Sequence, residues 1–408
     1  RRLICQNAKG TVIWTAVGVF SCDDQMVLEA DLLDPLRGHV DSGELPGAVV
    51  GVLRDGEVSF GAVGVRATAL SEELTADALV RISSNTKPLI AALTMALVDD
   101  EIVALYDPVE RFVPELADRR VLRRLDSDPA DTVAASRSIT VEDLLRMQLG
   151  FGFVFEQSCP AAEAADKAGL GFGPPDPSLP LTPDEWIARF AALPLLEQPG
   201  TTWRYELSYA VLGVLLARAA GRPLDELVRE RLLQPLGMHD TGFVAFAGRL
   251  PVCYARSGSE LTVFDDAADS RWTRRPAFPD ARGGMVSTAA DLLRFAAALL
   301  DDGAGVIAPT AVRAMTSDQL TAEQRRAPSA RSFLNGSGWG YGVEVTANEQ
   351  IRDGKPMRYG WGGGLGTLWY TWPEHRSAAV LLTQVLPPSG SIFDAFIAHA
   401  EALLADPS

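Results

Sequence analysis

The 408-residue sequence predicts an α+β fold, in which helices flank an antiparallel sheet and a mainly helical subdomain is inserted into it. Three observations support this fold class. Apolar runs at 48–53 and 58–63 surround Asp55-Gly56, a pair that favours a tight hairpin turn. Strand-like runs return only near the C-terminus, and helical spacing dominates the sequence between. We therefore expect the N-terminal and C-terminal strands to share one sheet.

The N-terminal region predicts a helix, the hairpin, a short strand and a longer helix. Residues 27–39 have leucines on one face, as an amphipathic helix requires. Residues 80–82 predict a short strand, and residues 89–98 repeat apolar side chains at helical spacing. Pro88 suits the first turn of that second helix because a missing N–H costs nothing there.

The middle of the chain has few strand signals and several helical ones. We expect helices over 141–147, 183–193, 207–219 and 224–233, with Thr140 and Thr182 as caps of the first two. Gly, Pro and Ala are frequent in residues 156–183, which predicts a long loop. Residues 249–280 have the pattern of an irregular or extended segment.

Strand signals return after a helix over 287–300. We expect strands at 340–345, 367–372 and 378–383, and a closing helix over 393–404. This order divides the chain into a sheet domain and an inserted helical domain. The sheet domain would be residues 26–107 and 275–408, and the helical domain residues 108–274.

Residues 1–25 combine early basic residues with a short apolar stretch, a pattern that resembles an export or lipoprotein signal. However, Phe20 fits a lipoprotein cleavage site poorly, and Met26 directly precedes the first helical pattern. We expect a leader or disordered segment outside the fold and a cytoplasmic location. Export is the alternative, if residues 1–25 are a genuine leader.

Composition excludes several classes of partner. The formal net charge of −16 opposes binding to nucleic-acid phosphates and to anionic membranes. No apolar run approaches the roughly 20 residues of a membrane span. The four cysteines are scattered without metal-type spacing, so a reducing compartment is the default. Oligomeric state, monomer or dimer, stays open.

Ser84 and Lys87 lie where the longer N-terminal helix is expected to begin. Residues three apart share a face of the first turn. Lysine occurs only four times in the chain, and a buried Lys, unlike Arg, can lose its proton. A hydroxyl beside an amine at the positive end of a helix is a candidate nucleophile and base. The alternative is a Ser cap beside a solvated Lys.

The histidines offer no competing site. His39, His239, His375 and His399 form no cluster along the sequence, and Ser84 lacks the Gly-x-Ser-x-Gly context of a nucleophile elbow. A zinc site would need more ligands at workable spacing. Lys therefore remains the candidate base, and we expect no metal and no cofactor.

A second motif lies at residues 205–207, Tyr-Glu-Leu. Together with the Ser-x-x-Lys motif at 84–87, it resembles the serine β-lactamase and penicillin-binding-protein superfamily. Within that superfamily, the sequence most resembles the class C β-lactamase-like carboxylesterases called family VIII esterases. Matching stretches at 234–243 and 283–292 extend the resemblance to nearly the whole chain.

The resemblance implies an acyl-enzyme mechanism. Ser84 would be the acylated nucleophile, and Lys87 and Tyr205 would act together as general base and later acid. A cationic Lys beside the phenol would lower the phenol's pKa, so that a proton could leave Ser84 near neutral pH. Taken alone, Tyr205 would be a core aromatic residue beside a helix.

Two departures from the family pattern concern the substrate. Leu207 stands where the second motif usually has Asn, which fits the esterase branch better than the lactamases. Trp361-Gly362-Gly363 takes the place of the third motif, which usually begins with Lys or His. Trp361 offers an apolar face and one N–H donor where a cation would bind a substrate carboxylate. The pattern therefore favours neutral, hydrophobic esters.

The resemblance also implies an oxyanion hole made by the backbone N–H groups of Ser84 and Gly364. Glycines at 362–364 would allow a ligand to approach the backbone closely. The alternative is a glycine loop that only starts a strand.

These expectations together describe a serine carboxylesterase that hydrolyses short- to medium-chain neutral esters, and weak β-lactam hydrolysis would be compatible with it. The same-fold alternatives are a β-lactamase, a D-amino-acid peptidase and an amidase. The alternative from another class is an inactive binding or sensor protein, since fold alone does not fix function.

Overall fold

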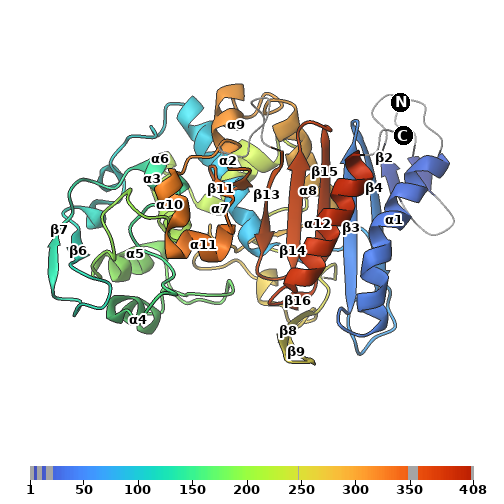
Figure 1. Cartoon of the computed structure of the whole chain (residues 1–408), viewed down its shortest axis with the longest axis horizontal. Coiled ribbons are helices and arrows are strands. Elements are labelled where there is room, and N and C mark those ends of the chain that lie inside the picture. The colour runs from blue at the N-terminus through green and yellow to red at the C-terminus, as the bar shows by residue number, and fades with distance from the viewer. Residues whose placement is uncertain (1–3, 7–11, 15–21, 247, 348–356, 406–408) are drawn as a thin grey trace.

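The computed structural model describes residues 4–6, 12–14, 22–246, 248–347 and 357–405. Its largest sheet is antiparallel and has the strand order β1-β2-β4-β3-β15-β14-β13-β12-β11 (Figure 1). The strands are β1 (Ile4–Gln6), β2 (Val12–Trp14), β3 (Gly47–Arg54), β4 (Glu57–Gly64), β11 (Gly338–Trp339), β12 (Glu344–Val345), β13 (Tyr359–Gly363), β14 (Thr367–Trp372) and β15 (Ser377–Thr383).

The predicted fold class is confirmed, and N-terminal and C-terminal strands do share the sheet. β3 and β4 form the predicted hairpin, and β3 pairs on its other side with β15, from Ala48↔Thr383 to Leu53↔Ala378. Along β3 and β15, successive side chains point to opposite faces of the sheet and pack into two different hydrophobic cores. Val50 and Leu381 face one core, and Val49 and Leu382 face the other.

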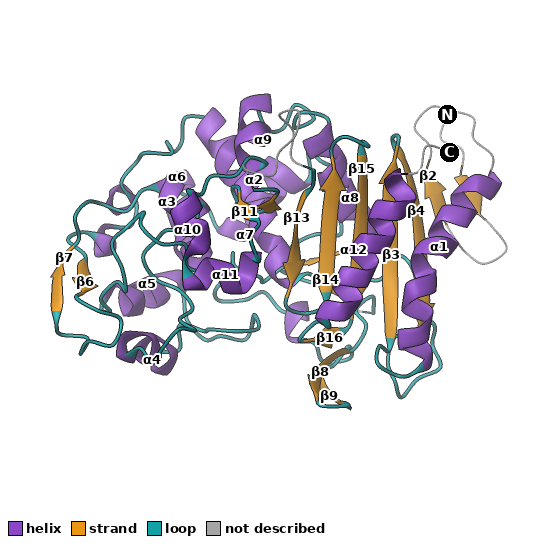
Figure 2. Ribbon diagram, in the orientation of Figure 1, coloured by secondary structure: helices purple, strands orange, loops and turns teal. Residues whose placement is uncertain are grey.

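Helices cover both faces of this sheet (Figure 2). α1 (Cys22–Asp41) and α12 (Gly390–Ala405) lie across one face, where Leu36 and Phe396 join the core of Val50. α8 (Ala289–Leu300) lies on the opposite face and packs so closely on β3 that a Cβ at Gly51 would lie 3.1 Å from Leu293. The predicted N-terminal, 287–300 and closing helices are thereby confirmed.

The helical part of the molecule lies at one end of the sheet (Figure 1). Thr140 and Thr182 cap their helices as predicted, each in a reciprocal capping box with the residue three positions later. The helices here are α2 (Thr86–Asp99), α3 (Val141–Leu145), α4 (Pro160–Lys167), α5 (Pro183–Ala191), α6 (Ser208–Ala220), α7 (Leu224–Val228), α9 (Pro309–Met315), α10 (Ala322–Arg326) and α11 (Pro328–Leu334). Shorter turns are η1 (Ser83–Asn85), η2 (Val109–Arg111), η3 (Pro114–Leu116) and the π-helical η4 (Arg229–Leu233).

Three small sheets complete the fold. β5 (Val80–Arg81) pairs with β10 (Val286–Ser287), and β6 (Arg120–Leu122) pairs with β7 (Thr132–Ala134). β8 (Cys253–Ser257) pairs with β9 (Glu260–Asp265) and with β16 (Val385–Leu386), and the 3₁₀ turn η5 (Arg271–Thr273) follows β9. Residues 249–280 are thus partly extended, as expected.

Two local predictions are wrong, and three helices were not predicted. Residues 156–183 are not one loop, because the Ala-rich stretch after Pro160 forms α4. A continuous strand at 340–345 is replaced by a turn between β11 and β12, since Gly342 has φ of +82° and a Cβ at Gly340 would lie 1.8 Å from the Met315 carbonyl oxygen. α9, α10 and α11 were not predicted at all.

The domain division at 108 and 274 stays a prediction. Several hydrogen bonds cross it, among them two from α10 and α11, which belong to the second sheet segment. Gln324 donates to Gly200 O at 3.0 Å, and Ser329 donates to Trp203 O.

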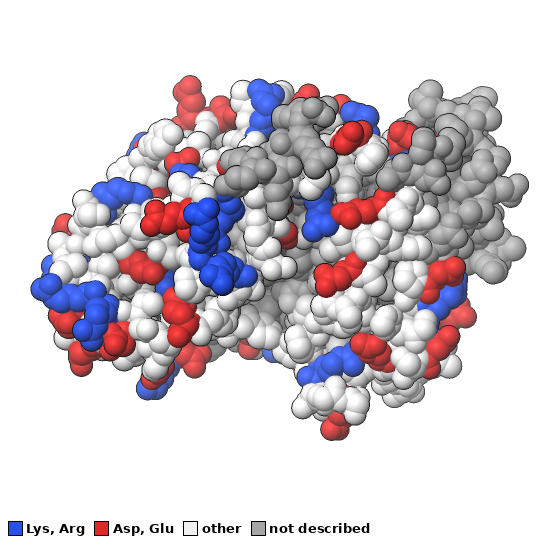
Figure 3. Space-filling model, in the orientation of Figure 1, with Lys and Arg blue, Asp and Glu red and all other residues white. Residues whose placement is uncertain are grey.

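The predicted leader falls mostly on residues 1–3, 7–11 and 15–21, which lie outside the described residues. Within residues 1–25, β1 and β2 form the edge of the sheet, and α1 begins at Cys22 rather than at residue 27. In the described part of the chain, no helix combines the length and the apolar character that crossing a membrane requires. On the face drawn in Figure 3, acidic and basic side chains are interspersed among the described residues.

Candidate active site

Ser84 lies in η1, the single turn that leads directly into α2, so the predicted helix start is confirmed. The turn is held from two sides. Ile82 N–H donates to Met285 O at 3.0 Å, and Thr367 of β14 donates its hydroxyl to Ile82 O at 2.9 Å. Asn85 in turn donates to the Thr367 hydroxyl at 3.1 Å. These bonds fix the candidate nucleophile in a single place, with 8% of its surface exposed.

Ser83, directly before the nucleophile, has φ of +47°. A non-glycine residue in this left-handed region is uncommon and costs free energy, so the surroundings must hold it there. The bonds to β14 and to the segment before β10 supply that restraint.

Lys87 is fully buried, and its amine lies against the candidate nucleophile. Lys87 Nζ donates to Ser84 Oγ at 3.0 Å and to the backbone oxygen of Arg282 at 2.6 Å. It lies 4.4 Å from the centroid of the Tyr205 ring. Burial lowers the pKa of Lys87 to about 8, against the opposing influence of the Glu206 and Asp280 carboxylates. An amine with such a pKa can accept a proton near neutral pH.

Tyr205 lies just before α6, and its hydroxyl accepts a hydrogen bond from Trp361 Nε1 at 2.9 Å. Burial and the Glu206 carboxylate raise the pKa of this phenol far above its ordinary value, although hydrogen bonds with Ser84 and Trp361 work the other way. The expected lowering of the phenol's pKa by Lys87 is therefore wrong. The amine lies over the ring face, and desolvation of the phenolate is the largest influence on the pKa of Tyr205.

Trp361, Gly362 and Gly363 form the end of β13 and pair with β14, so they belong to a strand and not to a loop before one. A Cβ at Gly363 would lie 2.4 Å from Ile82 O and 2.2 Å from Thr367 Oγ1, which leaves room only for glycine. Gly364 begins the turn that follows β13. A Cβ placed there would lie 3.8 Å from Ser83 Oγ, so Gly364 is next to the nucleophile turn.

The structure thus brings all the predicted site residues together at one end of β13. Lys87 and Tyr205 contact Ser84 directly, and Trp361 is connected to them through its hydrogen bond to Tyr205. Gly363 and Gly364 pack beside η1, whereas a Cβ at Gly362 would point toward Leu368 and Phe393. The geometry allows proton transfer from Ser84 to Lys87 and leaves Tyr205 protonated, as a hydrogen-bonding partner of the reacting hydroxyl.

Sequence reasoning missed three charged residues of this site. Glu206, Asp280 and Arg282 are all buried, and their charges act on Lys87. Of the three, only Glu206 could have been noticed in the sequence, because it is a charged residue between Tyr205 and the apolar start of a helix. Asp280 and Arg282 come from a segment that carried no motif.

Arg358 is the cation nearest to Trp361 in the sequence and the first candidate to replace the missing cation of the third motif. It pairs instead with Glu401 of α12 at 2.8 Å and lies over the Tyr370 ring. Tyr370 and α12 belong to the opposite face of the sheet, so Arg358 is not part of the site.

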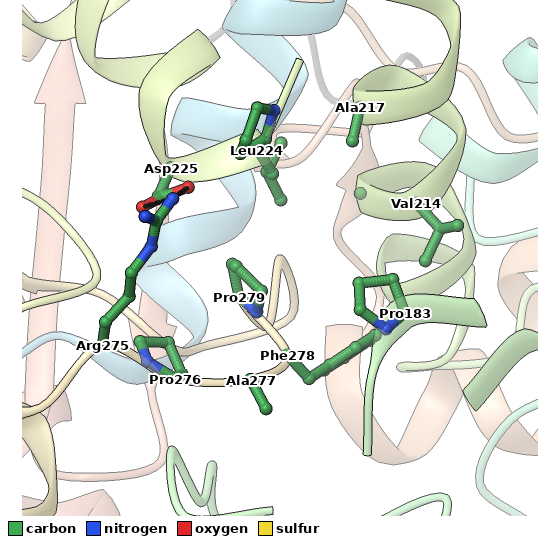
Figure 4. Close-up of a pocket in the computed structure, with 12 residues that line it drawn as sticks. Pro183, Val214, Ala217, Leu224, Asp225, Arg275, Pro276, Ala277, Phe278 and Pro279 are labelled. Atoms are coloured by element: carbon green, nitrogen blue, oxygen red, sulfur yellow. Dashed lines mark hydrogen bonds and ion pairs between the residues drawn. The ribbon is translucent and has the colours of Figure 1, made fainter. Parts of the chain in front are cut away.

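A separate cavity of about 280 Å³ lies between α6, α7 and residues 275–279 (Figure 4). Its walls are mainly proline and aliphatic side chains, and the Arg275–Asp225 ion pair lies at one side. None of the predicted site residues lines it.

Comparison with known proteins agrees with this geometry. A family model described as Beta-lactamase matches residues 33–404. The chain belongs to the beta-lactamase family. Protein Rv1367c of Mycobacterium tuberculosis is 34% identical over 390 residues, which covers 91% of this chain and 92% of that protein. Esterase EstB of Burkholderia gladioli is 31% identical over 362 residues, covering 83% of this chain and 86% of EstB.

The solved structure of EstCE1, described as a hydrolase with promiscuous acyltransferase activity, has the same fold, with a TM-score of 0.77 at 24% identity. The match covers 94% of this chain and 100% of EstCE1. Family membership and an esterase relative make this beta-lactamase family member an enzyme, a serine hydrolase.

Proposed function

We propose that this enzyme is a serine carboxylesterase that hydrolyses short- to medium-chain neutral esters through an acyl intermediate on Ser84. Lys87 would take the proton of Ser84 as its Oγ attacks the ester carbonyl carbon. The backbone N–H groups of Ser84 and Gly364 would stabilise the oxyanion that forms. The 3.0 Å contact between Ser84 and Lys87 supports the first step.

The proton then has to reach the leaving alcohol. Tyr205, which remains protonated, would donate toward the alkoxide and recover its proton from Lys87, so that the alcohol departs neutral. A water molecule would then give a proton to Lys87 as it attacks the acyl-Ser84 carbonyl carbon, and Lys87 would return this proton to Ser84 Oγ as the carboxylic acid leaves. The contacts of Ser84, Lys87 and Tyr205 with one another support these steps.

The observation that carries the substrate class is the position of Trp361. It stands where a carboxylate-binding cation would be expected, and its one N–H is already bonded to Tyr205. A substrate carboxylate beside it would be buried without a partner, at a cost of several kcal/mol. A neutral ester needs no such partner.

Aromatic side chains around Tyr205 support the same class. The Phe333 ring centroid lies 4.5 Å from that of Tyr205, and the Phe153 centroid lies 6.3 Å from it. Phe155 stacks on Phe153 and is 55% exposed. A partly exposed aromatic wall beside the catalytic group suits an apolar acyl or alcohol portion.

A second candidate activity is acyl transfer to an alcohol instead of to water. It shares every step up to acyl-Ser84, and EstCE1 is described as a hydrolase with a promiscuous form of that activity. The β-lactamase, D-amino-acid peptidase and amidase alternatives use the same acylation step. An inactive binding protein would not need the contacts that join Ser84, Lys87 and Tyr205.

The test compares kcat/KM for short-chain p-nitrophenyl esters with kcat/KM for nitrocefin. We expect the esters to be favoured by at least about a thousandfold, since each ~1.4 kcal/mol is a factor of ten. Ser84→Ala should abolish both activities, and Ser83→Ala is the matched control that keeps them. Comparable constants for the two substrates would contradict the esterase proposal, and a fully active Ser84→Ala enzyme would contradict the nucleophile.

We also propose a small-molecule ester as the only partner the site requires, and a cytoplasmic location. The buried free thiols of Cys159 and Cys253 support a reducing compartment.

A further inference from the structure

Four charged side chains are buried together behind the candidate nucleophile. They are Lys87 of α2, Glu206 just before α6, and Asp280 and Arg282 of the segment before β10. Two are acids and two are bases. A buried charge is tolerated only when another charge compensates it, so the way these four pair with one another matters.

Arg282 and Asp280 satisfy each other. Arg282 Nε donates to Asp280 Oδ1 at 2.9 Å, and Nη2 donates to Asp280 Oδ2 at 2.8 Å, the forked geometry of a strong ion pair. The remaining guanidinium nitrogen, Nη1, donates to the backbone oxygens of Leu170 and Gly171. With Asp280 engaged by Arg282, Glu206 is the acid of the group without an ion-pair partner among the described residues, and the charges of both Arg282 and Lys87 act on it.

Glu206 is 7% exposed, and its Oε2 is buried without a hydrogen bond to any described residue. An unpartnered buried carboxylate oxygen is costly, which argues that the residue is retained for something other than stability. Leu207, at the position where related motifs carry Asn, is fully buried and apolar, so Glu206 is the polar group that the second motif brings to the site.

We propose that Glu206 is a positioning residue that acts as the counter-ion of Lys87 and sets the pH at which this amine can accept the proton of Ser84. The proposal rests on the proposed function. If Lys87 loses its proton, Glu206 is left as a buried, unbalanced anion, and this opposes deprotonation of Lys87. Without Glu206, burial and the Arg282 charge would act on Lys87 with only Asp280 against them.

The directions of the pKa shifts of Lys87 and Glu206 agree with this role. Burial lowers the pKa of Lys87, and the Glu206 carboxylate is the first of two groups that raise it again. Burial raises the pKa of Glu206, and Arg282 and Lys87 oppose that rise. The other groups that contact Lys87 are Ser84, the ring of Tyr205 and the backbone oxygen of Arg282, which are uncharged.

The first experiment is the pH profile of kcat/KM for a short-chain p-nitrophenyl ester. Activity requires neutral Lys87, so in the wild type it should rise with pH and reach half its maximum near pH 8. Glu206→Gln removes the charge at nearly constant shape, so the midpoint should fall by about one pH unit or more. The control Glu142→Gln changes a carboxylate that contacts Tyr341 and Arg146, and it should keep the wild-type midpoint.

The second experiment reads Lys87 directly and does not depend on turnover. The four lysines of the chain give four ¹³Cε signals after selective labelling, and the signal that is lost in Lys87→Arg identifies Lys87. In a Ser84→Ala background, the titration midpoint of that signal should fall when Glu206→Gln is added. This measurement can succeed even if no ester proves to be a substrate.

Both readouts separate a charge effect from a structural one. A merely structural Glu206 would lower stability and total activity but leave both midpoints unchanged, and that result would overturn the proposal, as would a midpoint that rises. If Glu206→Gln does not fold, Glu206→Met replaces the buried charge by an apolar side chain of similar size and should give the same downward shift.

Discussion

The hydrogen bond from Trp361 to Tyr205 gives a prediction that can be worked out in numbers. Trp361→Phe keeps an aromatic ring against Tyr205 and Trp339, whose centroids lie 5.6 and 4.9 Å from that of Trp361. It removes the N–H that donates to the Tyr205 hydroxyl at 2.9 Å, together with part of the buried ring. Compared with a Trp-to-Phe change elsewhere in the same cluster, the substitution shows what that one donor does for the position of the hydroxyl.

A neutral hydrogen bond contributes about 1 kcal/mol net. If the bond holds Tyr205 in its reactive position, the transition state loses that amount, and kcat/KM should fall about fivefold. The assay is steady-state hydrolysis of a short-chain p-nitrophenyl ester by the wild type and the variant, at a temperature at which urea unfolding shows both to be folded.

Trp339→Phe is the matched control. Trp339 is also fully buried in the same aromatic cluster, but its N–H donates to Leu145 O at 3.2 Å and not to Tyr205. Both variants should lose similar amounts of unfolding free energy, about 2 kcal/mol or more, since each removes one buried hydrogen bond and part of a buried ring. Only Trp361→Phe should lose activity. Equal activities of Trp361→Phe and the wild type, or equal losses in the two variants, would refute the reasoning.

Two further predictions concern charged groups. Lys87→Arg keeps a cation but removes the proton acceptor, so kcat should fall at least about a thousandfold. The control Lys167→Arg, at an exposed position of α4, should leave kcat unchanged. Near-normal turnover of Lys87→Arg would mean that Lys87 is only a structural cation. Asp265→Asn should lower the unfolding free energy in urea by about 3–5 kcal/mol, because Arg81, which donates to Asp265 at 2.7 Å, would be left buried without its partner. Burial would raise the pKa of Asp265, but Arg81 and Ser270 hold it below its ordinary value. The stabilisation by the Asp265 carboxylate is therefore present above the unfolded-state pKa and is lost as the pH falls through the folded-state pKa. A loss of unfolding free energy under about 1 kcal/mol in Asp265→Asn at neutral pH would contradict the expectation.

The parts of the structure that sequence reasoning found are those encoded by neighbouring residues. Asp55-Gly56 sets a hairpin turn, Thr140 and Thr182 cap helices three residues on, and Ser84 and Lys87 share one helical turn. In each case the physical cause lies within a few residues of the chain, so the pattern and the structure agree.

The parts that were missed depend on contacts between distant segments. Arg282 reaches Lys87 across 195 residues of sequence, and no local pattern marks it. The high pKa of Tyr205 comes from burial, which the motif alone does not give. The Gly340–Val345 stretch has the composition of a strand, but a close approach to Met315 bends it into a turn. Tyr205 and Trp361 were assigned to the site because of the family resemblance, and their spacing in the sequence alone would not have indicated it.

The bond from Thr367 to Ile82 joins residues 285 positions apart, and it has a consequence for synthesis of the protein. While the chain emerges from the ribosome, Ser84 and Lys87 are made early, but the strand that fixes their turn is made near the end. The nucleophile therefore lacks its final geometry throughout most of translation, and a growing chain should be unable to acylate itself with cellular esters. Reactivity toward a covalent serine probe should appear only after β14 and β15 have left the ribosome and closed the sheet on β3, so labelling of stalled chains of graded length would time the completion of the fold.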